Sequence, residues 1–129
     1  NETPLTPLFL KLAAEIRQHA LPMQPFHDLL DAFSQDVIKK RYANFDELLD
    51  YCRRSANPVG RLLLHLYGKA TPVNIAYSDK ICTSLQLINF WQDVAKDYAI
   101  GRIYLPLDEM EKCGVTEEQI AQGAVVHTP

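Results

Sequence analysis

Apolar residues recur at helical spacing over most of the chain, with polar positions between them. A first stripe comprises Leu8, Leu12, Ile16 and Ala20, and a second comprises Phe26, Leu29, Leu30, Phe33 and Val37. Pro22 and Pro25 separate the two stripes. Spacings of three and four residues place such side chains on one face of a helix. The pattern therefore predicts two amphipathic helices, and we expect the second to bury its apolar face.

A third helix is predicted after Asn44, because Asn44 and Glu47 have the three-residue spacing of a capping box. Its apolar face comprises Leu48, Leu49, Cys52, Val59, Leu62, Leu63 and Leu66. Pro58 lies within this stripe and is expected to kink the helix, since proline lacks an amide hydrogen and its ring clashes with the preceding turn. Gly68 is a natural place for this helix to end.

The second half of the chain is helical by the same criterion. Residue 75 to about residue 98 reads as one long helix that ends at Gly101, and the stretch 101–106 looks extended. Thr116 and Gln119 form a second capping-box pattern, which opens a short last helix that Gly123 stops. No series of strands with a period of two residues is visible. The expected fold class is all-α, with a single domain over residues 1–129 held together by helix packing.

The composition suits one globular domain and narrows its partners. The chain has 129 residues, of which 47% are hydrophobic and 22% charged, and its formal net charge is −3. This mild balance argues against a nucleic-acid partner, whose binding surface would be basic. No apolar run approaches the roughly 20 residues of a membrane-spanning helix. Three cysteines without a C-x-x-C pair favour a reducing compartment, so we expect a cytoplasmic protein.

A narrow polar stripe runs along the predicted long helix. Gln86, Asn89, Asp93 and Asp97 are spaced by three, four and four residues, so they share one face. The residues around them are apolar. Because buried polar groups need partners, a polar stripe on an otherwise apolar helix usually lines a site.

The two aspartates indicate a cation site. Carboxylates four residues apart on a helix repel each other, and a cation between them removes that cost. Two carboxylates and one amide are hard oxygen ligands, which favour Mg²⁺ because it also holds phosphate oxygens. The alternative is a solvated charged face on which Lys96 balances Asp93 and Asp97. The sequence leaves both interpretations open.

Two further clusters suggest a site but have simpler explanations. Tyr51, Ser55 and Pro58 share a helical face, where a kink with small residues lets a ligand approach the backbone. Taken alone, this segment is better explained as a packing kink between core helices. Arg102 can contact a phosphate bidentately, or it is a surface arginine near a helix C-terminus, where a cation is favoured.

Taken in order, these clusters resemble the squalene/phytoene synthase family. Residues 85–97 (LQLINFWQDVAKD) followed by 101–106 (GRIYLP) look like the family's second aspartate-rich signature, and residues 51–60 (YCRRSANPVG) look like its upstream signature. These runs look most like the hydroxysqualene synthases of the bacterial hopanoid pathway. The resemblance implies the all-α helical bundle of the isoprenoid synthases, here about half of the domain. The family's first aspartate-rich motif and its C-terminal helices have no counterpart, so we expect this piece to be inactive alone.

The resemblance also implies a role for each candidate residue. Asp93 and Asp97 would bind Mg²⁺, with Asn89 as a further ligand. Tyr51 would act with the two aspartates in catalysis, over the reacting carbons or on the diphosphate. Substrate-binding roles fall to Gln86, Asn89, Arg102 and Tyr104. The position before the first aspartate is often Arg in the family and is Gln92 here, which puts a phosphate contact from it in doubt and fits the hydroxysqualene branch.

The implied activity is Mg²⁺-assisted loss of diphosphate from presqualene diphosphate, followed by capture of water to give hydroxysqualene. One alternative is head-to-head condensation of two prenyl diphosphates, such as farnesyl diphosphate, to squalene, dehydrosqualene or phytoene. A second alternative, from another class, is a non-catalytic helical interaction module. Because the implied substrates and products are hydrophobic, we also expect peripheral membrane association. The sequence leaves the oligomeric state open.

Overall fold

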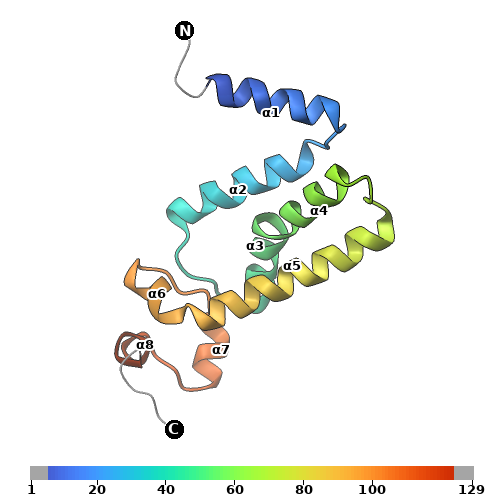
Figure 1. The fold of residues 1–129 in the computed structure, drawn as a ribbon. Coiled ribbons are helices and arrows are strands. Elements are labelled where there is room, and N and C mark those ends of the chain that lie inside the picture. The colour runs from blue at the N-terminus through green and yellow to red at the C-terminus, as the bar shows by residue number, and fades with distance from the viewer. Residues whose placement is uncertain (1–5, 124–129) are drawn as a thin grey trace.

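The described part of the chain consists of helices joined by loops. A computed structural model describes residues 6–123, so the ends of the predicted domain, 1–5 and 124–129, lie outside the described residues. The helices are α1 (Thr6–Gln18), α2 (Gln24–Ile38), α3 (Phe45–Ser55), α4 (Asn57–Leu66), α5 (Pro72–Gln92), α6 (Val94–Ala99), α7 (Leu107–Lys112) and α8 (Glu117–Gly123) (Figure 1). No strand forms within residues 6–123, which confirms the all-α class.

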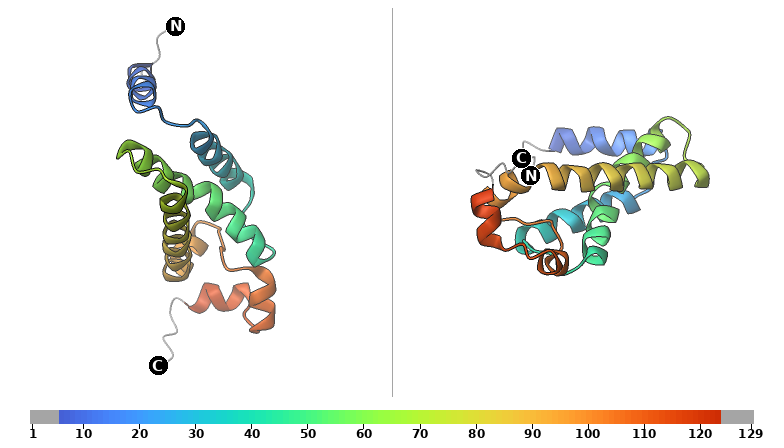
Figure 2. Two further views of the ribbon diagram at one scale, coloured as in Figure 1. Left: turned by 90° about the vertical axis from the view of Figure 1, so that its right-hand side faces the viewer. Right: turned by 90° about the horizontal axis from the view of Figure 1, so that it is seen from below.

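The centre of the molecule is built from α2 to α5. Helix α4 packs along α5, α2 packs on α3 and α4, and α3 also contacts α5. The left view of Figure 2 shows α1 at one end of the molecule and α7 and α8 at the other. None of these described helices is long and apolar enough to cross a membrane.

Both predicted capping boxes begin a helix. The Asn44 side chain accepts a hydrogen bond from the Glu47 amide at 2.9 Å, and the Glu47 carboxylate accepts one from the Ala43 amide at 2.8 Å. At α8, the Thr116 hydroxyl accepts from the Gln119 amide at 3.2 Å, and the Gln119 side chain accepts from the Thr116 amide at 3.0 Å. Each cap residue thus accepts from an amide that the first helical turn leaves without an acceptor.

Two predicted helices are each divided in the structure. The third forms α3 and α4, which meet at Ala56, because Pro58 cannot donate in the α-helical pattern and instead occupies the first turn of a new helix. The long helix begins at Pro72, capped by Thr71, rather than at Ile75. It is interrupted at Asp93, whose φ of −102° and ψ of 17° lie outside the α-helical range.

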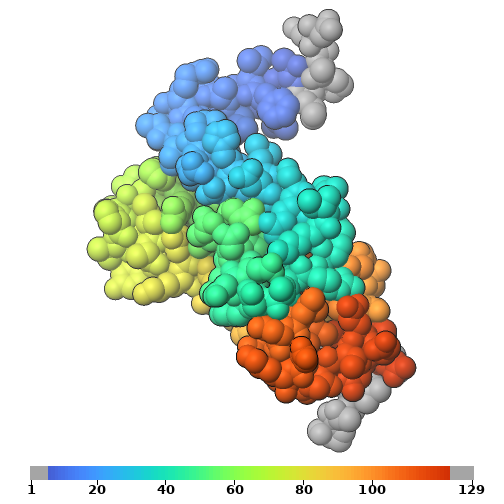
Figure 3. All heavy atoms as spheres, turned by 180° about the vertical axis from the view of Figure 1, so that it is seen from behind, coloured from blue at the N-terminus to red at the C-terminus, as the bar shows by residue number. Residues whose placement is uncertain are grey.

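The first two apolar stripes are largely exposed in the structure. None of the described residues of α1 is buried, and α1 lies at the end of the molecule farthest from α7 and α8 (Figure 3). On α2, Phe33 is 55% exposed and Val37 is 74% exposed. The prediction of burial was therefore wrong for much of the α2 stripe, because an amphipathic face is buried only where another element covers it.

The main buried cluster forms where two loops meet the helices. It comprises Ala32, Tyr42, Leu48, Tyr51, Cys52, Phe90 and Tyr104. The loop after α6 runs beside the loop between α2 and α3. The Ile103 amide donates to the Lys40 carbonyl at 3.0 Å, and the Leu107 amide donates to the Tyr42 carbonyl at 2.8 Å. The stretch 101–106 is non-helical, as expected, and these bonds position Tyr104 in the core.

Candidate functional site

Four aromatic rings from four different segments meet in the centre of the fold. Phe90 of α5 stacks on Tyr104 of the following loop, with ring centroids 4.1 Å apart and planes 7° apart. Tyr104 also stacks on Tyr51 of α3 at 5.8 Å and on Tyr42 at 5.7 Å. Tyr42 and Tyr51 are 5.5 Å apart. We call these residues the aromatic cluster; its ring faces are of the kind that attract a cation.

The hydroxyl of Tyr51 is held by a carboxylate on a different helix. It donates to Asp36 Oδ2 of α2 at 2.8 Å. The other carboxylate oxygen, Asp36 Oδ1, is buried without a hydrogen-bond partner among the described residues. Burial raises the pKa of Tyr51 far above its usual range, and the bond to Asp36 raises this pKa further. Tyr51 is therefore a neutral phenol at physiological pH.

Arg102 lies beside this pair. Its Nη2 donates to the main-chain carbonyl of Asp36 at 3.4 Å, and its Nε is buried without a partner within residues 6–123. Burial raises the pKa of Tyr104, and the Asp36 carboxylate adds to the rise, while Arg102 opposes it. Three of the predicted site residues, Tyr51, Arg102 and Tyr104, are thus brought together around Asp36.

The two predicted metal ligands flank the break between α5 and α6. Asp93 ends α5 and Asp97 lies in α6, and both side chains are half-buried. The Asp93 amide donates to the Asn89 carbonyl at 2.9 Å, and the Asp97 amide donates to the Asp93 carbonyl at 2.8 Å. The four-residue hydrogen-bond pattern thus continues through the break. The predicted polar stripe therefore keeps one face.

The environment of Asp97 opposes its negative charge. Burial raises the pKa of this carboxyl, and the nearby Asp93 carboxylate raises it further. Arg102 and Lys96 act in the opposite direction but do not cancel the rise. The two carboxylates therefore repel each other in a partly desolvated place, where a bound cation would relieve the repulsion.

Gln86 and Asn89 complete the stripe along α5. Gln86 is half-buried and Asn89 is exposed. Within the described part of the chain, neither side chain hydrogen-bonds another residue, and neither belongs to the aromatic cluster.

The donor set fits one side of a magnesium site. Asn89, Asp93 and Asp97 supply an amide oxygen and two carboxylates, which are the hard ligands that Mg²⁺ prefers. No group of three or more His, Cys, Asp or Glu residues is placed to hold a metal within residues 6–123. A magnesium ion held by these residues would need further oxygen ligands, which water or phosphate groups can supply.

Asp36 was not identified from the sequence. It lies fifteen residues before its partner Tyr51, so no helical spacing connects them. A lone aspartate on an amphipathic helix looks like an ordinary solvated residue. Only the packing of α2 on α3 brings its carboxylate to the Tyr51 hydroxyl.

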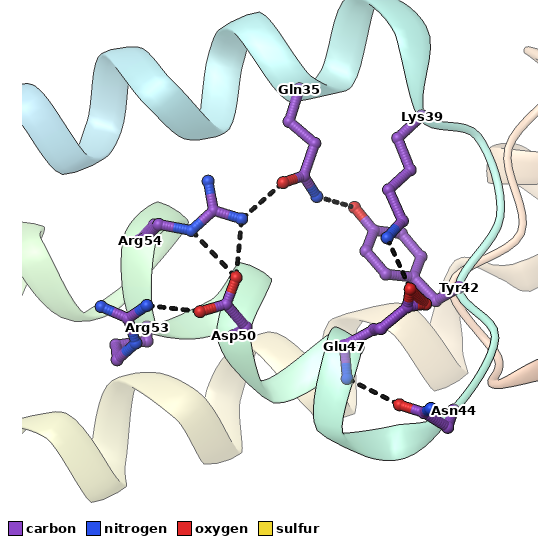
Figure 4. Close-up of polar contacts among 8 residues, drawn as sticks. All are labelled: Gln35, Lys39, Tyr42, Asn44, Glu47, Asp50, Arg53 and Arg54. Carbon is purple, nitrogen blue, oxygen red and sulfur yellow. Dashed lines mark hydrogen bonds and ion pairs between the residues drawn. The ribbon is translucent and has the colours of Figure 1, made fainter.

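A network of polar side chains also joins α2 to α3 (Figure 4). Arg54 bonds both Asp50 and Gln35, and the Gln35 amide in turn donates to the Tyr42 hydroxyl at 3.3 Å. Lys39 pairs with Glu47 at 3.0 Å, and its ammonium lies 5.1 Å from the centre of the Tyr42 ring. The two helices are therefore held together independently of Asp36.

The segment around Pro58 packs closely against α5. Pro58 is fully buried, and the Thr83 hydroxyl of α5 donates to the buried Asn57 side chain at 2.8 Å. A Cβ atom on Gly60 would lie 2.2 Å from Ser78 Oγ, so only glycine permits this approach of the helices. This agrees with the packing interpretation of the segment, although the Ser55 hydroxyl is buried there without a partner among the described residues.

The chain is similar in sequence to known proteins of one family. The chain matches the squalene/phytoene synthase family over residues 1–129. It is 43% identical to the hydroxysqualene synthase of Zymomonas mobilis over 90% of this chain and 40% of that protein. It is 40% identical to the hydroxysqualene synthase of Sinorhizobium fredii over 93% of this chain and 40% of that protein. The phytoene synthase of Mycobacterium tuberculosis is 35% identical over 84% of this chain and 36% of its own length.

A solved structure has the same fold. The crystal structure of squalene synthase HpnC from Alicyclobacillus acidocaldarius superposes with a TM-score of 0.84 at 43% identity, over 89% of this chain and 44% of that one. The chain thus spans about 40% of the length of the curated hydroxysqualene synthases that it matches. The match over all 129 residues and the shared helical fold show that the chain belongs to the squalene/phytoene synthase family.

Proposed function

We propose that the full-length protein converts presqualene diphosphate to hydroxysqualene in a Mg²⁺-dependent reaction. The observation that carries this proposal is the position of Asp97 between Asp93, the other proposed metal ligand, and Arg102, which lies beside Tyr51 and Tyr104. The Asp97 amide donates to the Asp93 carbonyl at 2.8 Å, and the Arg102 amide donates to the Asp97 carbonyl at 2.9 Å. Arg102 Nη2 also donates to the main-chain carbonyl of Asp36, whose carboxylate accepts from the Tyr51 hydroxyl. Anion-binding and cation-stabilising groups are therefore adjacent, as the loss of a diphosphate from a carbon atom requires.

Each of these residues would help to separate the diphosphate anion from the carbocation. Asn89, Asp93 and Asp97 would hold Mg²⁺, which as a Lewis acid stabilises negative charge on phosphate oxygens. The guanidinium of Arg102 can donate to the departing diphosphate. The faces of Tyr51, Tyr104 and Phe90 can stabilise the carbocation that is left. Water then adds to the cation and loses a proton, which yields the alcohol.

Sequence identity to the relatives supports the hydroxysqualene reaction over the condensation that forms phytoene. The two proteins named hydroxysqualene synthase are 40% and 43% identical to this chain, while the phytoene synthase is 35% identical. Gln92 stands where the family often has Arg, which also fits this branch.

The test uses the full-length protein with presqualene diphosphate and Mg²⁺ but no nicotinamide cofactor, and identifies the product by mass spectrometry. We expect hydroxysqualene, with its oxygen derived from ¹⁸O-labelled water. Asp93→Asn should abolish turnover without changing the far-UV circular dichroism. Asp46→Asn, at an exposed position of α3, is the matched control and should turn over normally. Full activity of Asp93→Asn would contradict the assignment.

The second candidate is head-to-head condensation of two prenyl diphosphates. It is supported by the phytoene synthase among the relatives and by the similar crystal structure, which is that of a squalene synthase. Incubation with farnesyl or geranylgeranyl diphosphate would then give a condensed hydrocarbon, while presqualene diphosphate would give no alcohol.

A non-catalytic helical module would behave differently from both enzymes. It would show no gain in thermal stability with Mg²⁺ and inorganic diphosphate together. The proposed enzyme should gain stability from the pair, and Asp93→Asn should lose this gain.

A further inference from the structure

The carboxylate of Asp36 makes one hydrogen bond to the candidate site: its Oδ2 accepts from the Tyr51 hydroxyl at 2.8 Å. The main-chain carbonyl of Asp36 accepts from Arg102 Nη2 at 3.4 Å and from Lys40 Nζ at 2.6 Å. One turn of α2 therefore contacts two residues of the site that come from α3 and from the loop after α6. We infer that Asp36 is a positioning residue for the proposed reaction, acting through the Tyr51 hydroxyl. This inference rests on the function proposed above.

The packing of α2 on α3 does not depend on this bond. Arg54 and Gln35 already join the two helices, and Lys39 pairs with Glu47 (Figure 4). A phenylalanine at position 51 and an apolar residue at position 36 would fill similar space. A carboxylate with one oxygen buried and unpartnered is unfavourable for stability. Its presence is explained if it serves the chemistry of Tyr51.

Asp36 determines what Tyr51 presents to a ligand. A phenol has one proton, and the Tyr51 proton is directed at the carboxylate. The oxygen lone pairs therefore face away from Asp36. A hydrogen bond to a charged acceptor also polarises the phenol, which increases the electron density of its oxygen and ring. Both effects strengthen the attraction between Tyr51 and a carbocation that forms above the aromatic cluster.

A double-mutant cycle in the full-length protein tests this coupling. Asp36→Asn, Tyr51→Phe and the double variant are compared with wild type in kcat and KM for presqualene diphosphate. Asp36→Asn keeps the shape and an acceptor oxygen but loses the charge. We expect it to lower kcat roughly 10- to 100-fold, the effect of weakening a charge-assisted hydrogen bond, with KM unchanged. The double variant should be no slower than Tyr51→Phe, because Asp36 acts only through that hydroxyl.

The control is Asp31→Asn, which removes the same charge from an exposed position of the same helix and should keep wild-type kinetics. If Asp36→Asn fails to fold, Asp36→Glu replaces it, because it keeps the charge but displaces it by one methylene. A second readout is the ¹³Cζ resonance of labelled Tyr51, assigned with Tyr51→Phe. It should shift in Asp36→Asn and stay in place in Asp31→Asn.

Three results would overturn the inference. One is an Asp36→Asn enzyme with wild-type kcat. Another is a double variant whose losses multiply, which would make Asp36 act independently of Tyr51. The third is a rise in KM with kcat unchanged, which would mean that Asp36 contributes to substrate binding. Each of these requires an active wild type, whereas a wild type that turns over no prenyl diphosphate would overturn the proposed function and this inference with it.

Discussion

Among single residues, Asp97 has the clearest electrostatic consequence. Its folded-state pKa is raised, by burial first and by Asp93 second, so the folded protein binds a proton there more tightly than the unfolded chain does. Ionisation of Asp97 consequently costs folding stability. The cost is absent below the ordinary pKa of aspartate, grows as the pH rises through the raised pKa, and is complete at neutral pH.

Asp97→Asn should therefore raise the melting temperature of the full-length protein at pH 7 without divalent cations, by a few degrees at most because the group is only partly buried. At a pH below the ordinary pKa of aspartate, the variant and wild type should melt together. Thermal unfolding followed by circular dichroism at the two pH values measures the difference.

Addition of Mg²⁺ with diphosphate should reverse the order at pH 7, since only wild type offers both carboxylates to the cation. Asp31→Asn serves as the exposed control and should show neither effect. A variant that is less stable than wild type in metal-free buffer would mean that the Asp97 carboxylate is favourably paired and not strained by its neighbour.

At the scale of the helices, the contact of α4 with α5 depends on the missing side chain of Gly60. A Cβ atom there would lie 2.2 Å from Ser78 Oγ and 2.7 Å from Cys82 Sγ. Gly60→Ala should destabilise the protein by about 1–3 kcal/mol, as overpacking does, although alanine favours the helix intrinsically. Chemical denaturation measures this loss.

The second variant of this pair is Ser78→Ala, which removes the closer atom. The Ser78 Cβ would lie an acceptable 3.6 Å from the new methyl group. Gly60→Ala with Ser78→Ala should therefore recover part of the stability that Gly60→Ala loses. Additive effects of the two changes would show that α4 simply moves away from α5 and that the contact is not specific.

The helices also show which predictions local spacing can support. Both helix caps were confirmed, because a cap is a contact between residues three positions apart, although the Glu47 carboxylate accepts from Ala43 and not from Asn44. The breaks at Ala56 and Asp93 were not predicted. Pro58 was expected to kink one continuous helix, yet it begins a new one in the structure. The burial of the α2 stripe was also overestimated, because periodicity identifies an apolar face but not what covers it.

At the scale of the molecule, Arg41 connects the segment after α2 to α8 and to the start of the loop after α6. Its guanidinium pairs with Glu117 of α8 at 2.9 Å and donates to the Gly101 carbonyl at 2.7 Å. The partners are 76 and 60 residues away in sequence. The bond from Arg41 lowers the pKa of Glu117. The ion pair therefore contributes to folding stability above the ordinary pKa of glutamate, and this contribution is lost as the pH falls through the lowered pKa.

Glu117→Gln should therefore increase hydrogen–deuterium exchange in α8 at neutral pH, while the aromatic cluster stays protected. Exchange mass spectrometry of the full-length protein measures both regions. Glu118→Gln, its exposed neighbour, is the control and should exchange like wild type. Equal exchange of Glu117→Gln and wild type would show that the ion pair contributes nothing measurable, as is common at protein surfaces.

Relations between neighbours in sequence can be read from spacing alone. The helical class, the helix caps and the polar stripe Gln86, Asn89, Asp93 and Asp97 all follow from contacts three or four residues apart, which a helix repeats wherever it forms. The motifs 51–60 and 85–106 resemble their family for the same reason, because each is a continuous run of residues.

The arrangement around Tyr51 depends on the tertiary fold. Asp36 and Tyr51 lie on different helices, and Tyr104 and Tyr42 come from two loops that are distant in sequence and joined by hydrogen bonds. No periodicity relates these positions, since the packing of α2 on α3 and the path of residues 101–106 decide which side chains meet. Burial, in turn, decides the pKa of Tyr51 and Asp97, because desolvation depends on every neighbour in space.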